Sequence, residues 1–378
     1  MSIKMKDDNF IEIVEGETTS YSNDDLYNIT SWGADFSFRE IIERYNDGEI
    51  IKPELQRKYV WNKHEASRFI DSILLGLPVP AVFFAKQEDE SMLIVDGYQR
   101  IMSVRDFIRG QFSGDDSSFR LSTQEDINSR WRGMSFSELD VMEQRRLKNT
   151  TIHTIIFEQK QPCDDTGMYQ IFERINTGGR VLKPQEIRNC VYRGEFNNKL
   201  FILNKDDVWR TIIGNKREDN RMADLELILR FFAMKDIHIR KESKAKQINL
   251  VKYLNDYMND MKKQSSEFIT EYSKQFITMI HKAHEIFGDD VFRKYNKTTD
   301  RFTKKLNPAV YDAISVALDN AIKKKTICPD RDYKMLYKKL FSNVEFKKAT
   351  TNRTTNIDNI KKRISKASEI VFGIEYEW

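Results

Sequence analysis

The segment 92–110 constrains the fold of this chain most strongly. The apolar run 92–95 (MLIV) leads into Asp96-Gly97-Tyr98-Gln99-Arg100, and an apolar stripe follows at positions 101, 104, 107 and 108. The run has the length of a buried strand, and the stripe has the spacing of one helix face that ends at Gly110. A strand that turns through Asp-Gly into an amphipathic helix is typical of α/β proteins. The sequence therefore predicts a helix packed on a sheet around this turn.

The preceding segment indicates the same arrangement. Asn62 and Glu65 have the spacing of a capping box, which would start a helix with one apolar face that ends at Gly76. Prolines at positions 78 and 80 then return the chain to a strand at 81–85, and a short polar turn joins that strand to 92–95. We expect these two strands to meet at the Asp96 turn.

Periodicity divides the rest of the chain. Residues 1–30 are polar and acidic, which predicts a flexible arm or an edge strand, and order is expected to begin with a helix near Phe36. A helix is expected at 131–147 and a β-branched strand at 151–157, whereas long amphipathic windows follow Asp164. We predict an arm at 1–30, an α/β domain at 31–200 and a basic, mainly helical domain at 201–378.

Composition excludes several classes of protein. The chain has 378 residues, of which 40% are hydrophobic, so it can form one large core or two ordinary ones. No window approaches the roughly 18 apolar residues of a membrane span, and the N-terminal sequence lacks the apolar centre of an export signal. The three cysteines are widely spaced and form no C-x-x-C pair. We expect a cytoplasmic protein with reduced thiols and no membrane contact.

Charge is distributed unevenly along the chain. Residues 1–200 carry 26 Lys and Arg against 33 Asp and Glu, whereas residues 201–378 carry 36 against 25. Most of the positive excess lies in 291–370, where 20 basic residues accompany 8 acidic ones. Such a region can neutralise nucleic-acid phosphates, although lysines also commonly solvate the outer faces of helices. Both interpretations stay open, and DNA is the partner that the first one implies.

The Asp96 turn has the chemistry of a phosphate site. A helix that starts after a glycine turn presents backbone N–H groups and the positive end of its dipole to one spot. Asp96 could cap that helix or bind a metal ion or water, Gly97 would let a ligand approach the backbone, and Arg100 could bind phosphate oxygens. The alternative is an ordinary strand–helix turn with a surface arginine.

Two further groups of residues could contribute to the same site. Gln56 and Arg57 lie in an extended stretch before the capped helix, and a second guanidinium there could reach the same anion. Arg174 and Asn176 lie where an amphipathic helix runs into a Thr-Gly-Gly loop. Each group also has a structural alternative: Arg57 could pair with a nearby carboxylate, and the Gly-Gly loop could be a simple helix connector.

Four motifs in this order and rough spacing resemble a known family. They are Leu55-Gln56-Arg57, the stretch 70–80 (IDSILLGLPVP), the stretch 95–100 (VDGYQR) and the stretch 172–179 (FERINTGG). Together they resemble the N-terminal domain of the GmrSD-type, modification-dependent restriction enzymes, a branch of the ParB and sulfiredoxin-like superfamily. The resemblance implies a ParB-like α/β core that binds a nucleoside triphosphate with Mg²⁺ and can hydrolyse it.

The resemblance also implies roles for individual residues. The arginines at 57 and 100 would bind the phosphates, Asp96 would hold Mg²⁺ or a water, and Gln99 would orient that water. Gln56, Gly97 and Tyr98 would complete the nucleotide contacts, and Arg174 with Asn176 would support the pocket. The implied catalytic set is therefore Asp96, Gln99 and Arg100.

The sequence departs from the family pattern in two places. Family members usually have glutamine where this chain has Tyr98, so binding is more secure than hydrolysis; the Tyr98 hydroxyl could replace the lost amide, or its ring could stack on a base. We also find no strand–helix hairpin with the His and Asn of an HNH nuclease in 201–378.

These observations lead to three hypotheses. The first is a nucleotide-dependent component of a DNA restriction or phage-defence system. The second is a non-enzymatic DNA sensor that recruits a separately encoded nuclease, and the third is a nickase within the ParB-like core. A homo-oligomer is compatible with each of them.

Overall fold

The computed structural model describes residues 10–12, 17, 28–52, 61–161, 166–175, 182–219, 221–237, 240 and 244–378. The chain forms two compact units. Asp24–Val191 make up the first, which we call the sheet unit, and Met1–Asn23 with Tyr192–Trp378 make up the second, which we call the helical unit. The boundary therefore falls nine residues before the one expected from the sequence, and the first residues of the chain are assigned to the helical unit.

The sheet unit is built on one mixed five-stranded sheet with the strand order β1-β5-β3-β4-β2. Its strands are β1 (Asn28–Ser37), β2 (Ile50–Ile51), β3 (Val82–Lys86), β4 (Met92–Asp96) and β5 (Thr151–Gln161). β1 pairs antiparallel with β5, and β3 pairs antiparallel with β4. The β3–β5 and β2–β4 pairs are parallel. The two strands expected on either side of the polar turn at 87–91 are thus confirmed as neighbours.

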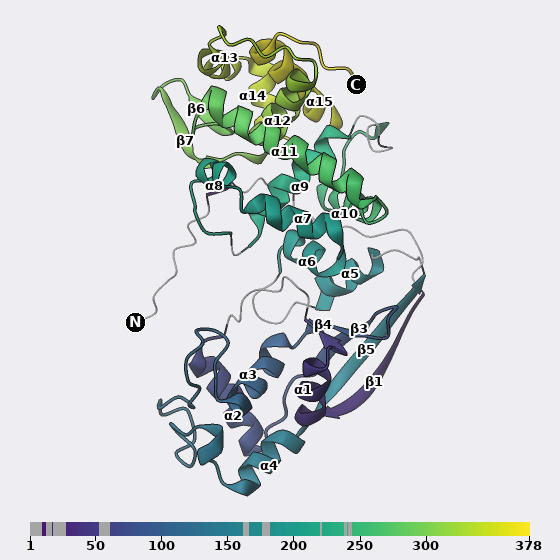
Figure 1. Ribbon diagram of the computed structural model, residues 1–378, viewed down its shortest axis with the longest axis vertical. Coiled ribbons are helices and arrows are strands. Elements are labelled where there is room, and N and C mark those ends of the chain that lie inside the picture. The colour runs from purple at the N-terminus through teal and green to yellow at the C-terminus, as the bar shows by residue number, and fades with distance from the viewer. Residues whose placement is uncertain are drawn as a thin grey trace. The chain divides into compact units, whose positions relative to one another are not determined.

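Helices cover this sheet and bury an apolar core against it (Figure 1). They are α1 (Phe38–Asn46), α2 (Lys63–Leu75), α3 (Tyr98–Arg109) and α4 (Val141–Asn149), and the unit also contains α5 (Thr166–Ile175) and α6 (Pro184–Val191). The capping box of α2 is formed as expected: Asn62 accepts a hydrogen bond from the Glu65 N–H, and the Glu65 side chain accepts one from the Asn62 N–H. Gly76 ends the helix in a left-handed conformation with φ of 79°. The predicted α/β class is confirmed.

Two expectations for this unit are wrong in detail. Strand β1 precedes α1, although order was expected to begin with the helix near Phe36. Apolar Trp32, Ala34 and Phe36 alternate with Gly33 and polar residues along this strand, which pairs over its length with β5. The helix expected at 131–147 is instead a turn, a short 3₁₀ segment Phe136–Glu138 and α4. Asp140 divides the stretch because it caps α4 by accepting from the Glu143 N–H.

The helical unit consists mainly of packed helices, as the sequence predicts. They are α7 (Glu195–Asn204), α8 (Asp207–Ile213), α9 (Ala223–Lys235), α10 (Leu250–Met261), α11 (Ser266–Phe287), α12 (Pro308–Lys323), α13 (Tyr333–Leu340), α14 (Val344–Thr351) and α15 (Ile357–Ala367). An unpredicted hairpin of β6 (Arg293–Asn296) and β7 (Arg301–Leu306) interrupts them. No helix of the described residues has the length and apolarity that crossing a membrane requires.

A buried network of charged side chains lies at the centre of the helical unit. Arg230 of α9 donates to Asp312 of α12 over 2.6 Å and to Glu17 over 2.6 Å. Arg363 of α15 donates to the same Asp312 oxygen over 2.9 Å. Burial lowers the pKa of Arg230, but Asp312 and Glu17 outweigh it and raise that pKa above its ordinary value. The network joins the N-terminal segment to three helices.

We expect Asp312→Ala to destabilise the helical unit by about 3–5 kcal/mol, because it leaves two buried guanidinium groups with one carboxylate fewer. Urea unfolding followed by circular dichroism measures the change. Glu271→Ala is the control, because Glu271 is exposed and its ion pair with Lys274 lies at the surface; it should change the stability by less than about 1 kcal/mol. Equal effects of the two variants would show that the network does not carry the stability assigned to it.

Candidate functional site

The Asp96 turn lies at the end of β4, where the chain passes through Gly97 into α3. Gly97 has a φ of 100°, a backbone conformation that side chains disfavour. A Cβ atom at this position would also lie 2.4 Å from Cγ1 of Val82 on β3. Glycine is therefore required by the close packing of the turn on β3 as well as by the backbone.

Arg100 and Asp96 form an ion pair across the first turn of α3. The other terminal nitrogen of Arg100, Nη1, donates to the carbonyl oxygens of Pro80 and Ala81 over 2.8 and 2.5 Å. The Arg100 side chain is only 12% exposed, whereas that of Asp96 is 31% exposed. Three of the five N–H donors of the guanidinium are thus used within the protein, and two are left over.

The expectation that Asp96 caps α3 is wrong. The cap position of the helix is Gly97, which has no side chain that could accept a hydrogen bond from the first-turn N–H groups. Asp96 is instead directed to Arg100, which attracts the carboxylate more strongly than a backbone N–H does. The first turn of α3 therefore keeps the positive potential of an uncapped helix N terminus.

Gln99 connects this turn to the segment that precedes α2. Its side-chain oxygen accepts a hydrogen bond of 3.2 Å from the backbone N–H of Trp61. The Trp61 ring in turn contacts Phe69 of α2, with ring centroids 5.8 Å apart. Gln56 and Arg57 lie just before this point, outside the described residues. The structure thus brings the end of their segment to the Asp96 turn.

Tyr98 is directed into the sheet unit. Its ring packs against the apolar core, and its hydroxyl interacts with that of Tyr45 on α1. Burial, followed by the influence of Tyr45, raises the pKa of Tyr98 well above its ordinary value. The phenol is therefore neutral at physiological pH. This position accounts for tyrosine at the third residue of the turn: the side chain fills space between α1 and α3.

Arg174 of the third predicted group lies on α5, which precedes α6. Helix α5 contacts both β4 and α6, so these helices belong to the same unit as the turn. Arg174 is exposed near the end of α5, and Asn176 lies outside the described residues. Arg188 of α6 is buried and donates to Gln185 over 2.9 Å, and Gln185 donates to Asn189 over 3.0 Å. These hydrogen bonds link three buried side chains of α6 to one another.

The described residues contain no cluster of three or more His, Cys, Asp or Glu side chains that could hold a metal ion alone. Mg²⁺ does not need such a cluster, because it commonly binds one or two carboxylates together with phosphate oxygens and water. Asp96 uses one oxygen for Arg100, and its other oxygen has no hydrogen bond to any described residue. The donor set at the turn is thus compatible with Mg²⁺ that arrives with phosphates.

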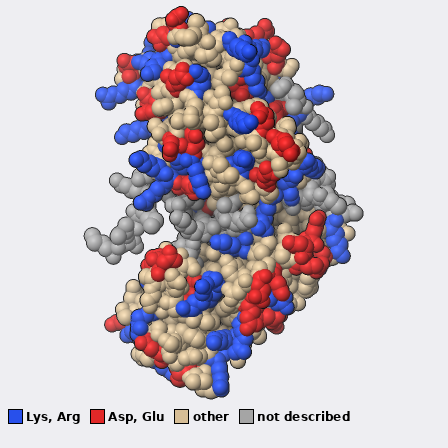
Figure 2. All heavy atoms as spheres, viewed as in Figure 1, with Lys and Arg blue, Asp and Glu red and all other residues tan. Residues whose placement is uncertain are grey.

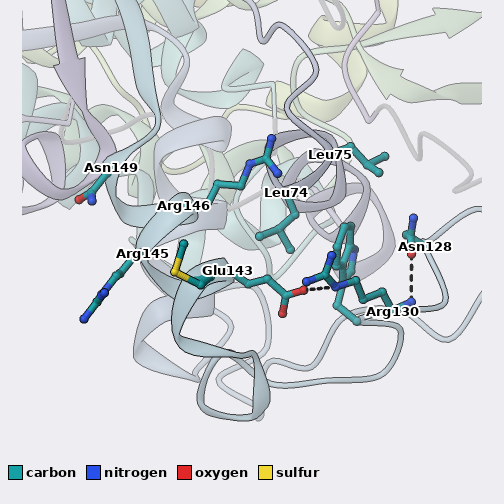
Figure 3. A pocket seen from close by; sticks show the side chains of 10 residues that line it. Leu74, Leu75, Asn128, Arg130, Glu143, Arg145, Arg146 and Asn149 are labelled. Atoms are coloured by element: carbon teal, nitrogen blue, oxygen red, sulfur yellow. Dashed lines mark hydrogen bonds and ion pairs between the residues drawn. The ribbon is translucent and has the colours of Figure 1, made fainter.

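A separate open pocket of about 650 Å³ lies between the end of α2 and α4 (Figure 3). It is lined by Leu74, Leu75, Asn128, Arg130, Trp131, Met142, Glu143, Arg145, Arg146 and Asn149, none of which is a predicted site residue. Arg130 is neutralised there by Glu143, with Nε and Oε1 2.6 Å apart. The Asp96 turn remains the candidate site, because the predicted residues Asp96, Gln99 and Arg100 lie there and not in this pocket.

Comparison with known proteins identifies the segment that carries this turn. No curated protein and no solved structure matches the chain. Residues 38–193 match the family model described as the GmrSD restriction endonuclease, N-terminal domain. This range runs from α1 to just past α6, so it includes the Asp96 turn, α2, α5 and α6. Residues 38–193 therefore belong to the family of GmrSD restriction endonuclease N-terminal domains.

Proposed function

We propose that this protein is a nucleoside-triphosphate-binding and hydrolysing component of a DNA restriction or phage-defence system. The family of the sheet unit supports the restriction role. The observation that carries the nucleotide site is the uncapped N terminus of α3 beside the Asp96–Arg100 pair. Phosphate is the anion that such a helix start, a guanidinium and a carboxylate-bound metal ion accommodate together.

Most of the predicted residues receive a role in this proposal. Phosphate oxygens would meet the first-turn N–H groups of α3 and the remaining donors of Arg100, with Arg57 as the second guanidinium. Asp96 would hold Mg²⁺, which would neutralise charge on the phosphates. Gln99 would orient the attacking water. Gln56, Arg174 and Asn176 would complete the pocket around the nucleotide.

Arg100 would bind phosphate as a cation whose position is already fixed. Its bonds to the carbonyls of Pro80 and Ala81 fix the guanidinium before any ligand arrives. A fixed cation loses little conformational entropy on binding, so its charge contributes more to affinity than that of a mobile side chain. The cost is that only part of its donor set remains for phosphate.

The second candidate function is a DNA sensor that recruits a separate nuclease and hydrolyses nothing. The observation that favours it is the basic segment 291–370, which forms much of the helical unit. The two functions are compatible, because nucleotide bound in the sheet unit could control DNA contact by the helical unit. They differ in one measurable property, the release of phosphate from a nucleoside triphosphate.

Asp96→Asn should lower Mg²⁺-dependent nucleotide affinity at least about tenfold, because the amide keeps the contact with Arg100 but loses the charge that binds the metal. Titration calorimetry with a panel of ATP, GTP, CTP and UTP measures this affinity, and a phosphate-release assay measures turnover. Asp116→Asn is the matched control: it removes the same charge from an exposed loop, and its left-handed backbone, with φ of 56°, accepts asparagine.

Two outcomes would contradict the nucleotide site. One is a wild-type protein that binds none of the four nucleotides. The other is an Asp96→Asn variant that keeps wild-type affinity in the presence of Mg²⁺.

Tyr98→Phe and Tyr45→Phe should have equal effects, because each removes one hydroxyl of the same pair. We expect each to lower stability by about 1 kcal/mol and to leave phosphate release within about twofold of wild type. Thermal unfolding and the phosphate-release assay provide the two readouts. If Tyr98→Phe alone abolished hydrolysis, the Tyr98 hydroxyl would act on the nucleotide or its water, contrary to the position described above.

A further inference from the structure

The β6–β7 hairpin is the one two-stranded sheet among the described residues of the helical unit. Its strands pair antiparallel, with Tyr295 opposite Phe302 and Asn296 opposite Arg301. The residues toward its tip are exposed, whereas Leu306 at its base is buried. The hairpin therefore extends from the packed helices toward solvent (Figure 1).

The base of the hairpin is held firmly in the unit. The Arg293 side chain is buried and donates to the carbonyl of Ile212 on the α8 side over 2.8 Å. The Tyr337 hydroxyl of α13 donates to the carbonyl of Arg293 over 2.7 Å. The ring of Phe302 stacks on Tyr337 with centroids 5.6 Å apart and an interplanar angle of 12°. These contacts fix the direction in which the hairpin points.

The N-terminal segment braces the same base. Ile11 forms a parallel bridge with Leu306, and Lys294 pairs with Glu12 over 3.0 Å. Glu12 also accepts a 2.7 Å hydrogen bond from Asn307, the residue that caps α12. The hairpin is thus supported from both sides before its exposed part begins.

The exposed part carries positive charge without neutralising partners. Lys297, Arg301, Lys304 and Lys305 are all exposed, and none of their side chains pairs with a carboxylate of the described residues. The acidic residue of the hairpin, Asp300, is already held by Tyr295 over 2.6 Å and by Lys338 over 2.9 Å. Figure 2 shows Lys and Arg side chains projecting from the flank where Figure 1 places the hairpin.

Some other lysines of the helical unit differ from this group. They pair with a carboxylate one helical turn away, as exposed Lys323 does with Asp319 and the partly exposed Lys282 and Lys366 do with Glu285 and Glu369. Such pairs reduce the positive potential of the helix surface. The hairpin instead keeps its charge available to an external anion.

We propose that the β6–β7 hairpin is the element that contacts DNA, by entering the major groove of the duplex. This inference rests on the DNA contact in the proposed function and names the element responsible for it. A major groove about 12 Å wide admits a two-stranded ribbon, whose strands lie about 4.8 Å apart. Arg301, Thr303 and Lys305 alternate along β7 and therefore face the same side, so the two cations reach the phosphates together.

The test compares two charge-matched double variants of the full-length protein. Arg301→Ala with Lys305→Ala removes two positive charges from the hairpin, and Lys347→Ala with Lys348→Ala removes two from exposed positions of α14. Fluorescence anisotropy with a labelled duplex of about 20 base pairs, measured over a range of salt concentrations, gives the affinity and its salt slope. Nucleotide affinity of each variant is measured in parallel.

The hairpin variant should bind DNA at least about tenfold more weakly and lose about two units from the slope of log affinity against log salt. The α14 variant should stay close to wild type in both. Nucleotide affinity should not change, because the substitutions lie outside the sheet unit. An RNA duplex of the same sequence should bind more weakly than the DNA, because its major groove is too deep and narrow for the ribbon.

Each contrary result has a distinct meaning. If the wild-type protein binds no DNA, the DNA contact itself fails while the nucleotide site stands or falls by its own test. Equal losses of DNA affinity in the two double variants would show that the hairpin is not the contact element and that charge spread over the helical unit binds the DNA. Equal affinity for the RNA and DNA duplexes would overturn insertion into the major groove.

Discussion

The contact of Arg100 with three parts of the sheet unit holds the candidate site together. One guanidinium joins the end of β4 through Asp96, the first turn of α3 through its own backbone, and the start of β3 through the carbonyls of Pro80 and Ala81. Carbonyl oxygens that precede an inner strand cannot all find partners in the sheet, and a nearly buried arginine satisfies two of them. The position of the turn follows from this contact.

The same contact explains why the turn can be both rigid and open. Asp96 is withdrawn from the helix start by Arg100, so α3 begins without a side-chain cap. An uncapped helix start normally costs stability, typically about 1 kcal/mol relative to a capped one. Here the ion pair and the packing of Gly97 on Val82 offset that cost. A helix N terminus without a side-chain cap is a common place for an anion to bind.

The helical unit uses arginine for a similar purpose in its interior. Arg230 and Arg363 converge on Asp312, and Glu17 adds a second carboxylate from a distant part of the sequence. Because these charges are buried, removal of one of them costs much more than the loss of a surface ion pair. Glu17 and the bridge between Ile11 and Leu306 both attach the N-terminal segment to this unit. The Ile11–Leu306 bridge lies at the base of the β6–β7 hairpin.

Much of the sheet unit could be predicted from local patterns. The capping box at Asn62 and Glu65, the two apolar runs and the Asp-Gly turn are short-range signals, and they produced α2, β3, β4 and α3 close to the expected limits. Strand β1 was expected only as one of two alternatives for residues 1–30, and its extent to Ser37 depends on pairing with β5, more than 100 residues away in sequence. The β6–β7 hairpin was missed because its short strands are rich in Lys and Arg and have few apolar residues to mark a strand.

The sequence by itself determined the order of the motifs, the chemistry of the Asp96 turn and the concentration of basic residues after 290. Only the tertiary structure decided how those side chains are used. Every residue has a backbone carbonyl, so the sequence does not reveal that those at 80 and 81 accept hydrogen bonds from Arg100. The pairing of Tyr98 with Tyr45 could not be inferred from the sequence either. The physical reason is that residue type fixes what a side chain can bind, whereas packing fixes which partner lies within reach.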